Sequence, residues 1–374
     1  MNSEAFIRGL LKKADIEING SRPFDMRVYD PRLYSRVIKE GTLGLGEAYM
    51  EGWWDASALD QFFARVIGAR LGRYIWFNPV AIGEYIRSRI LNAGKKENAF
   101  VIGEQHYDLG NDFFEKMLDP RMVYTCAYFK DGVADLNIAQ EAKLDLVCKK
   151  LGLKKGDKVL DIGCGWGSFA KFAAEKYGAE VTGVTVSKEQ AELARERVKG
   201  LPVEIRLEDY RDTQGQFDHI VSLGMFEHVE FKNHRAYFEV ASRVLKPEGL
   251  FLLHTIGKYG HGGPTDPWIK KYIFPVGIIP TPKQIEKGMG GYFKALDWHK
   301  FGGSHYDRTL MAWHENFARH WLEMKEKYGG LFRGQFERMW RYYLLSCAGA
   351  FRSGSLDLWQ IVLSKEDREY EEVR

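Results

Sequence analysis

The 374-residue chain has the composition of a folded globular protein rather than of a disordered or fibrous one. Hydrophobic residues make up 45% of it and charged residues 28%, the usual balance for a protein with a sizeable core. The formal net charge is only +3, and Lys and Arg are interleaved with Asp and Glu, so no basic run predicts a nucleic-acid partner. The length predicts a catalytic domain with a smaller companion.

Cysteine spacing and hydropathy exclude further classes of protein. The N-terminal stretch MNSEAFIRGLLKKADIEI lacks the cleavage site of a signal peptide, and no stretch approaches the ~20 apolar residues of a membrane-spanning helix. The cysteines are widely spaced and form no C-x-x-C pair, which favours a reducing cytoplasm and predicts neither a metal site nor a disulfide framework. They are Cys126, Cys148, Cys164 and Cys347. We expect a cytoplasmic protein that touches a membrane, if at all, only at its surface.

Residues 1–95 are expected to form a small, mainly helical unit, which includes the aromatic-rich stretch LGLGEAYMEGWWD. Aromatic rings mixed with arginines suit the headgroup level of a bilayer, and we expect this unit to contact lipid. The same pattern fits an ordinary domain with aromatic residues in its core and arginines in solvent. Between Leu59 and Asn92 the residues concerned are Phe62, Phe63, Trp76, Phe77, Arg65, Arg70, Arg73, Arg87 and Arg89.

The polar segment NAGKKEN at 92–98 marks the predicted domain boundary, which gives domains at 1–95 and 96–374. From about Leu151 onwards, apolar strand-like runs alternate with helical stretches, beginning with KVLDIGCG and SFAKFAAEKYG. This alternation is typical of an α/β fold with a mostly parallel, doubly wound sheet. The later stretches LKPEGLFLLHTIG and LWQIVLSK are expected to complete that sheet.

A glycine-rich loop follows the first strand of this sheet. In VLDIGCGWG, Asp161 precedes Gly163, Gly165 and Gly167, and glycines there let the backbone approach a ligand closely. The spacing is G-x-G-x-G, whereas a dinucleotide fold requires G-x-G-x-x-G. The loop resembles that of class I S-adenosylmethionine methyltransferases, in which the acidic residue and the loop backbone hold the amino-acid end of the cofactor.

Two later strand ends add candidate cofactor contacts. The second strand ends in GVTVSKEQ without an acidic residue, so Thr185 and Gln190 are expected to bond the ribose hydroxyls instead. After the next strand, Asp209 and Tyr210 follow Glu208 where an acid and a flat side chain usually recognise adenine. Each signal is weak alone, but together and in order they are specific.

Further motifs connect the chain to a family. HYDLGNDFF, YTCAYF, GMFEHV, HTIG and HYDRTLMAW together resemble those of the cyclopropane-fatty-acyl-phospholipid and mycolic acid cyclopropane synthases. The resemblance implies a Rossmann-like class I methyltransferase fold with a smaller N-terminal lipid-binding domain. It also implies cofactor contacts from Tyr124, Thr125 and Leu223, a homodimer, and peripheral association with the phospholipid bilayer at the inner face of the membrane.

The implied reaction transfers a methylene group from S-adenosylmethionine to the cis double bond of an unsaturated phospholipid acyl chain. An isolated alkene is a poor nucleophile, so the sulfonium methyl must be held close and in line. Addition leaves a carbocation that water would quench, so the acyl chain needs a dry slot. A base must then remove a proton from the transferred methyl before the ring closes.

In the family that base is a bicarbonate ion, and the resemblance implies a site here formed by Cys126, Glu227, His254, Ile256 and Tyr306. His254 and Tyr306 donate hydrogen bonds to an anion, and Glu227 accepts from the bicarbonate hydroxyl. His254 closes the apolar strand LFLLHTIG, a position where α/β sheets place residues that face ligands.

Other interpretations remain open for these residues. Glu227-His228 at the start of a helix is also typical of a cap or a surface pair, and Cys126 of a small buried hydrophobic residue. A catalytic, nucleophilic role for Cys347 is the weaker interpretation, because no His or basic residue is adjacent to it in sequence, and we expect it to line the acyl channel.

The stretch DPWIKKYIFPVGIIPTP, residues 266–282, fits either a cover over the substrate or an ordinary packed connection. Its candidate wall residues are Tyr272, Phe274, Ile278 and Ile279, and Lys270 or Lys271 is a candidate phosphate contact. Two other functions are compatible with the same motifs. One is methyl transfer to a soluble amine or other small molecule, and the other is an inert lipid carrier, which the intact glycine loop and anion-site residues oppose.

Overall fold

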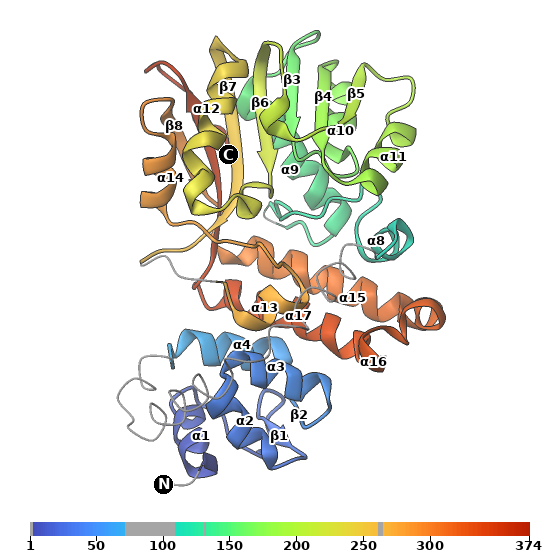
Figure 1. Ribbon diagram of the computed structural model, residues 1–374, viewed down its shortest axis with the longest axis vertical. Helices are drawn as coiled ribbons and strands as arrows, with labels where there is room; N and C mark the ends of the chain where they lie inside the picture. The colour runs from blue at the N-terminus through green and yellow to red at the C-terminus, as the bar shows by residue number, and fades with distance from the viewer. Residues whose placement is uncertain (1–2, 72–108, 131, 261–264) are drawn as a thin grey trace. The chain divides into compact units, whose positions relative to one another are not determined.

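A computed structural model of the chain describes residues 3–71, 109–130, 132–260 and 265–374 (Figure 1). Within these ranges, no helix is long and apolar enough to cross a membrane. The chain divides into two compact units. The first contains residues 3–71, Leu109, 265–275 and 306–355, and the second contains 110–260, 276–305 and 356–374. The predicted boundary near residue 95 lies outside the described residues and stays a prediction.

The first unit is mainly helical and draws on both halves of the sequence. Its short strands β1 (Arg27–Val28) and β2 (Trp54–Asp55) pair antiparallel. The N-terminal helices are α1 (Ser3–Lys12), α2 (Arg32–Glu40), α3 (Thr42–Met50) and α4 (Leu59–Gly68). They are joined by α13 (Pro267–Tyr272), most of α15 (Gly303–Tyr328), α16 (Leu331–Gly334) and α17 (Phe336–Arg352).

Aromatic side chains form much of the interior of the first unit. Phe62 and Phe63 of α4 are only 1% and 6% exposed, and their rings contact those of Trp54 and Tyr342 at centroid distances of 5.0 Å. For these two phenylalanines the core interpretation is confirmed. Of the other residues considered for headgroup contact, Arg73, Trp76, Phe77, Arg87 and Arg89 lie outside the described residues.

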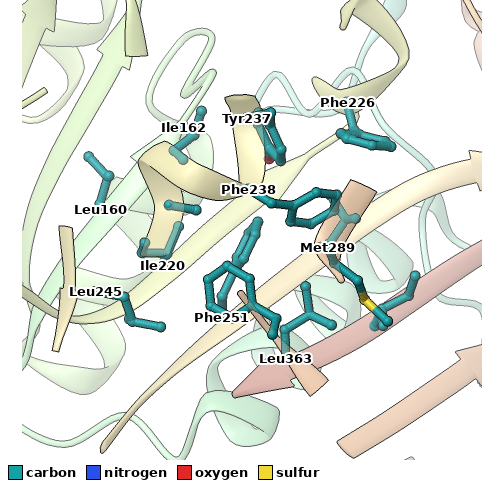
Figure 2. Packing of buried hydrophobic residues seen from close by; sticks show 14 of the residues in the cluster. Leu160, Ile162, Ile220, Phe226, Tyr237, Phe238, Leu245, Phe251, Met289 and Leu363 are labelled. Atoms are coloured by element: carbon teal, nitrogen blue, oxygen red, sulfur yellow. The ribbon is translucent and has the colours of Figure 1, made fainter. Parts of the chain in front are cut away.

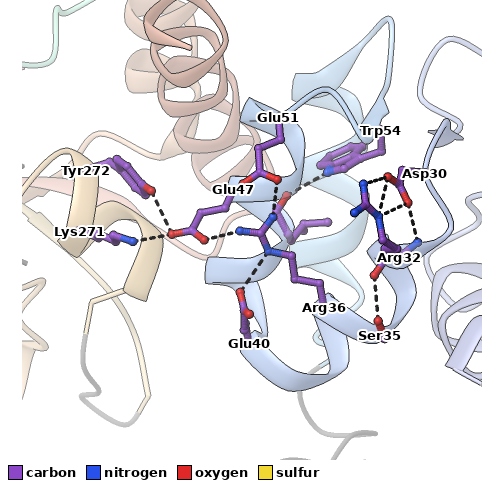
Figure 3. A network of polar contacts seen from close by, with 11 residues as sticks. Asp30, Arg32, Ser35, Arg36, Glu40, Glu47, Glu51, Trp54, Lys271 and Tyr272 are labelled. Atoms are coloured by element: carbon purple, nitrogen blue, oxygen red, sulfur yellow. Dashed lines mark hydrogen bonds and ion pairs between the residues drawn. The ribbon is translucent and has the colours of Figure 1, made fainter. Parts of the chain in front are cut away.

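A charged network centred on Glu47 fixes α13 to α3 (Figure 3). The Glu47 carboxylate accepts hydrogen bonds from Arg36 at 2.6 Å, from the Lys271 ammonium at 2.6 Å and from the Tyr272 hydroxyl at 3.0 Å. All three contacts lie within the first unit. Lys271, one of the two candidate phosphate contacts, therefore has an internal partner for its charge.

The second unit is built on a seven-stranded sheet with the order β5-β4-β3-β6-β7-β9-β8. Strand β9 runs antiparallel to both of its neighbours, and the other pairs are parallel. The strands are β3 (Lys158–Ile162), β4 (Glu180–Thr185), β5 (Val203–Leu207), β6 (Phe217–Leu223), β7 (Leu245–Gly257), β8 (Lys294–Lys300) and β9 (Asp357–Ser364). The predicted doubly wound α/β sheet is confirmed, including its two late strands.

Alternating strand residues bury opposite faces of this sheet, as period-two geometry requires. On one face, Leu160, Ile220 and Phe251 pack with Phe238 and Met289 from helices α12 (His234–Val244) and α14 (Pro282–Met289) (Figure 2). The opposite face packs against α9 (Leu136–Leu151) and α10 (Ser168–Tyr177). The buried apolar residues on that side include Val159, Val221, Leu252 and Val362 from the strands and Leu144, Val147 and Phe169 from the helices. Helices α8 (Asn111–Met117) and α11 (Lys188–Arg197) complete the unit.

Gly46 gives a direct test of the packing in the first unit. A Cβ atom at Gly46 would lie 2.3 Å from the ring of Trp268, which is fully buried. Gly46→Ala is expected to lower the free energy of unfolding by about 1–3 kcal/mol, because overpacking outweighs the better helix propensity of alanine.

Gly9 on α1 is the matched control, because a Cβ there would meet no described atom within 4 Å. Gly9→Ala should leave stability unchanged or raise it by up to ~1 kcal/mol. Urea unfolding of both variants measures the difference, and equal stabilities would refute the predicted clash.

Candidate functional site

The candidate site is formed at the carboxyl ends of the central strands. The strand order reverses between β3 and β6, and open α/β sheets bind ligands where the order reverses. Asp161 lies near the end of β3, Glu227 follows β6, and His254 lies near the end of β7. Because Leu223 and His254 are paired in register between β6 and β7, these predicted residues belong to neighbouring strand ends.

The segment around the glycine loop after β3 provides a buried carboxyl group, that of Asp161, and open space beside the loop backbone. Asp161 is 2% exposed, and its Oδ2 atom has no hydrogen-bond partner among the described residues. Burial raises the pKa of Asp161 to about 7, against the opposing effect of the Lys143 charge. Gly163 and Gly165 have φ of 80° and 54°, and a Cβ at Gly165 would meet no described atom within 4 Å. The loop therefore fits a ligand that approaches its backbone closely.

The ends of β4 and β5 supply the other predicted cofactor residues. The Thr185 hydroxyl lies 3.2 Å from the Gln190 amide oxygen, so these two neutral groups are adjacent, as the sequence predicts. Asp209 accepts hydrogen bonds from the Arg211 guanidinium at 2.6 and 2.9 Å. The ring of Tyr210 contacts that of Tyr237 at 5.4 Å. The roles of Asp209 and Tyr210 toward adenine stay predictions.

The segment that carries Tyr124, Thr125 and Cys126 is held by two buried polar side chains of α9. Lys143 donates to the Thr125 hydroxyl at 2.8 Å, and the Gln140 amide donates to the Thr125 carbonyl oxygen at 2.9 Å. Both side chains are fully buried, and burial lowers the pKa of Lys143 to about 8. Sequence reasoning missed them, although polar residues spaced i, i+3 beside Leu144 and Val147 of an apolar helix face are a readable signal.

Glu227 connects three segments of the second unit. Its Oε1 atom accepts a hydrogen bond of 2.6 Å from the Ile256 amide, and its carbonyl oxygen accepts one of 2.7 Å from the Ile278 amide. Its Oε2 atom has no hydrogen-bond partner within the described part of the chain. Burial raises the pKa of Glu227 to about 7, and the Ile256 hydrogen bond opposes this shift. Its burial excludes the interpretation as an exposed surface pair.

The side chain of His254 is fully buried. One of its ring nitrogens has a hydrogen-bond partner among the described residues, and the other has none. The Gln360 amide nitrogen lies 3.3 Å from Nδ1. Nε2 has no hydrogen-bond partner in the regions that the structure describes. Burial and the charges of Lys143 and Lys150 lower the pKa of His254 well below its usual value, so the ring is neutral at physiological pH.

The second unit contains all the predicted site residues except Tyr306 and Cys347. Tyr306 lies on α15 in the first unit, where its ring stacks on Phe351 at a centroid distance of 4.4 Å. Cys347 lies on α17, and burial raises the pKa of its thiol to about 12, which opposes a nucleophilic role. Cys126 is fully buried in the second unit. The roles of these residues stay predictions.

Comparison with known proteins gives concordant matches. Residues 94–361 match a family described as mycolic acid cyclopropane synthetase. The chain is 50% identical over 359 residues to the cyclopropane-fatty-acyl-phospholipid synthase of Escherichia coli K12, covering 95% of this chain and 92% of that protein. It is 34% identical over 356 residues to the tuberculostearic acid methyltransferase UfaA1 of Mycobacterium tuberculosis, covering 89% and 81%.

A solved structure matches the fold. The mycolic acid cyclopropane synthase CmaA1 complexed with SAH and CTAB aligns with a TM-score of 0.63 and 32% sequence identity, covering 71% of this chain and 98% of that chain.

The raised pKa of Glu227 predicts a pH-dependent stability cost. Between its ordinary value of 4.5 and its folded value of about 7, the folded state keeps a proton that the unfolded state releases, so the free energy of unfolding falls as pH rises. Glutamine does not ionise. Glu227→Gln should therefore be more stable than the parent above about pH 7, by on the order of 2 kcal/mol, with no gain near pH 4.

The exposed Glu239 on α12 is the matched control, and Glu239→Gln should show no such pH dependence. Urea unfolding at several pH values measures both variants. A stability gain for Glu227→Gln that is constant from acid to neutral pH would contradict the cost of burying this carboxylate.

Proposed function

This chain belongs to the mycolic acid cyclopropane synthetase family of S-adenosylmethionine-dependent methyltransferases, and we propose that it converts cis double bonds of phospholipid acyl chains into cyclopropane rings. The similarity to a cyclopropane-fatty-acyl-phospholipid synthase extends over almost the whole of both chains, which supports a phospholipid substrate. One observation carries the site assignment. Asp161, Glu227 and His254 each present a buried polar atom without a hydrogen-bond partner among the described residues.

The residues at the ends of β3 and β4 fit S-adenosylmethionine. The buried Asp161 Oδ2 suits the ammonium group of its amino-acid end, and Gly165 leaves open space beside the loop backbone. Thr185 and Gln190 would bind the ribose hydroxyls, with further contacts from Gly163, Asp209, Tyr210 and Leu223. When bound, the cofactor supplies an electrophilic methyl group. The methionine end would lie beside Tyr124 and Thr125, which Lys143 and Gln140 position.

The residues at the ends of β6 and β7 suit a small anion. His254, being neutral, offers hydrogen bonding without a competing positive charge, and the free Oε2 of Glu227 accepts from a hydroxyl. Bicarbonate carries both a hydroxyl and basic oxygens. We assign it to Glu227, His254, Ile256 and Cys126 of this unit, and the expected role of Tyr306, which belongs to the first unit, stays a prediction. A bound bicarbonate supplies the base.

In the proposed reaction, the alkene forms a carbon–carbon bond with the methyl group as the sulfur–carbon bond breaks. The resulting carbocation loses a proton from the new methyl group to the base, and the released electron pair closes the ring. Glu227 would orient the base through the bicarbonate hydroxyl, and the reaction requires a dry slot for the acyl chain, because water would trap the cation. Wall residues such as Ile278 and Ile279 would line the acyl chain beside Glu227.

A methyl-branched product is the second candidate. One relative is named a methyltransferase of tuberculostearic acid and not a cyclopropane synthase. The same cation yields a branched or methylene chain when the ring does not close. The Glu227 and His254 geometry favours ring closure, since both groups position a base.

We further propose that the enzyme works as a cytoplasmic homodimer bound peripherally to the inner face of the membrane. A phospholipid substrate lies in a bilayer, which supports a surface-bound enzyme. The first unit is the proposed lipid-contacting part. Among its arginines, Arg65 already pairs with Asp15 at 2.8 Å and lies over the ring of Phe24, whereas Arg70 is exposed.

Mass spectrometry of acyl chains tests the chemistry. Vesicles of monounsaturated phospholipid, incubated with protein, S-adenosylmethionine and bicarbonate, should gain one CH₂ per double bond, and fragmentation should identify a ring. Glu227→Gln and His254→Ala should reduce turnover by about 10²-fold or more, because each removes a group that positions the base. Removing dissolved CO₂ should slow the reaction, and added bicarbonate should restore it.

Glu239→Gln is the control in this assay and should keep full activity. A saturated methyl-branched product would select the second candidate. Unchanged lipid in the presence of tight cofactor binding would refute cyclopropanation and favour a soluble amine substrate.

Vesicle co-sedimentation tests the bilayer proposal. Binding to anionic vesicles should weaken as ionic strength rises, because salt screens attraction between exposed cations and headgroups. Arg70→Gln should weaken binding at low salt. Lys188→Gln, which removes an exposed charge from the second unit, should not. Salt-independent binding, or equal effects of the two variants, would contradict headgroup docking by the first unit.

A further inference from the structure

A row of polar side chains crosses the sheet beside the candidate anion site. His254 on β7 pairs in register with Gln360 on β9, and Gln360 pairs in register with His299 on β8. Residues directly opposite each other in antiparallel strands point to the same face of the sheet. The residues next to this row, Leu252 and Val362, pack on the face covered by α9. Gln360 therefore lies between two histidines on a buried face.

Gln360 contacts the Nδ1 atom of the His254 ring, and Nε2 is the other ring nitrogen. Its amide nitrogen lies 3.3 Å from Nδ1, and both side chains are fully buried. With the amide in this orientation, its nitrogen donates and Nδ1 accepts, while the Gln360 amide oxygen has no partner among the described residues. A neutral imidazole that accepts at Nδ1 carries its proton at Nε2. Nε2 is the ring atom that has no partner among the described residues.

We propose that Gln360 is a positioning residue that holds His254 in the tautomer protonated at Nε2. The consequence for catalysis rests on the proposed function, in which Nε2 faces bicarbonate. In the other tautomer, the Nε2 lone pair would face the anion and repel it. A neutral N–H donor orients the anion without transferring a proton to it, so the basicity that the ring closure needs is kept.

The surroundings of the row support a neutral His254. Lys143 and Lys150 both disfavour a positive charge on the ring. Lys150 donates to His299 Nδ1 at 3.0 Å and pairs with Asp297 at 3.3 Å. Asp297, the acid nearest to the row on β8, is thus neutralised by Lys150 and also by Arg374, at 2.7 Å. Among the described contacts of His254, no carboxylate accepts from its ring.

Gln360→Glu is the decisive substitution because it keeps the shape and reverses the hydrogen bond. A carboxylate accepts from Nδ1–H and stabilises an imidazolium, so His254 should change to the Nδ1–H or the charged form. Long-range ¹H–¹⁵N spectra of histidine-labelled protein distinguish these forms directly, and His254→Gln assigns the signal. The wild type should show Nε2–H between about pH 6 and 8.

Gln360→Glu should lose activity because it changes the tautomer of His254. We expect kcat to fall about 10–100-fold in Gln360→Glu, as for other residues that orient a ligand from behind, with the KM for S-adenosylmethionine unchanged. Gln284→Glu is the matched control, because Gln284 caps α14 in the same unit and glutamate fills that capping position equally well. It should alter neither the His254 signal nor kcat.

Two results would overturn the inference: a wild-type His254 protonated at Nδ1, or a Gln360→Glu variant with unchanged signal and activity. If Gln360→Glu does not fold, Gln360→Met removes the donor without adding charge and should give mixed tautomers. The tautomer measurement needs no lipid. An Nε2–H signal in a protein that makes no cyclopropane would support the role of Gln360 while refuting the proposed function.

Discussion

The hydrogen bond between the Ile256 amide and the Glu227 carboxylate is the contact on which the candidate site depends. At 2.6 Å it connects the turn after β6 to the end of β7, and the Ile278 amide adds the segment before α14 through the Glu227 carbonyl. Strand β7 is paired on both sides, with β6 and β9, so the hydrogen bond from Ile256 anchors Glu227 to the interior of the sheet. The Oε1 atom of Glu227 accepts this structural hydrogen bond, and its Oε2 atom is available to a ligand.

This arrangement has a cost, because buried ionisable groups without full partners destabilise a fold. Asp161, Glu227 and Lys143 are all buried. Burial raises the pKa of the two carboxyl groups and lowers the pKa of the lysine, so it favours the neutral form of each. The two apolar layers that cover the sheet offset this cost, and Figure 2 shows side chains of one of them. The same low dielectric makes every interaction with a bound ligand stronger than it would be in water.

Much of the fold and part of the site could be predicted from sequence, and the limits have a physical origin. The glycine loop after β3 is a local signal, since strand, acid, glycines and helix follow one another within the segment from Lys158 to Tyr177. The helices that join the first unit from residues 265–275 and 306–355 could not be predicted, because only long-range packing such as Trp268 against Gly46 places them there. Gln360 was missed for the same reason, because its partner His254 lies 106 positions away.

The protonation states of the site suit the binding of an anion. His254 is neutral, and the pKa of Glu227 lies at about 7. A negative charge placed beside Glu227 raises that pKa further, so a bound anion and the carboxyl group share a proton instead of repelling each other. A carboxylate with an ordinary pKa would be ionised at neutral pH and would exclude the anion. In the proposed reaction, the burial that weakens the fold is therefore what allows the base to bind.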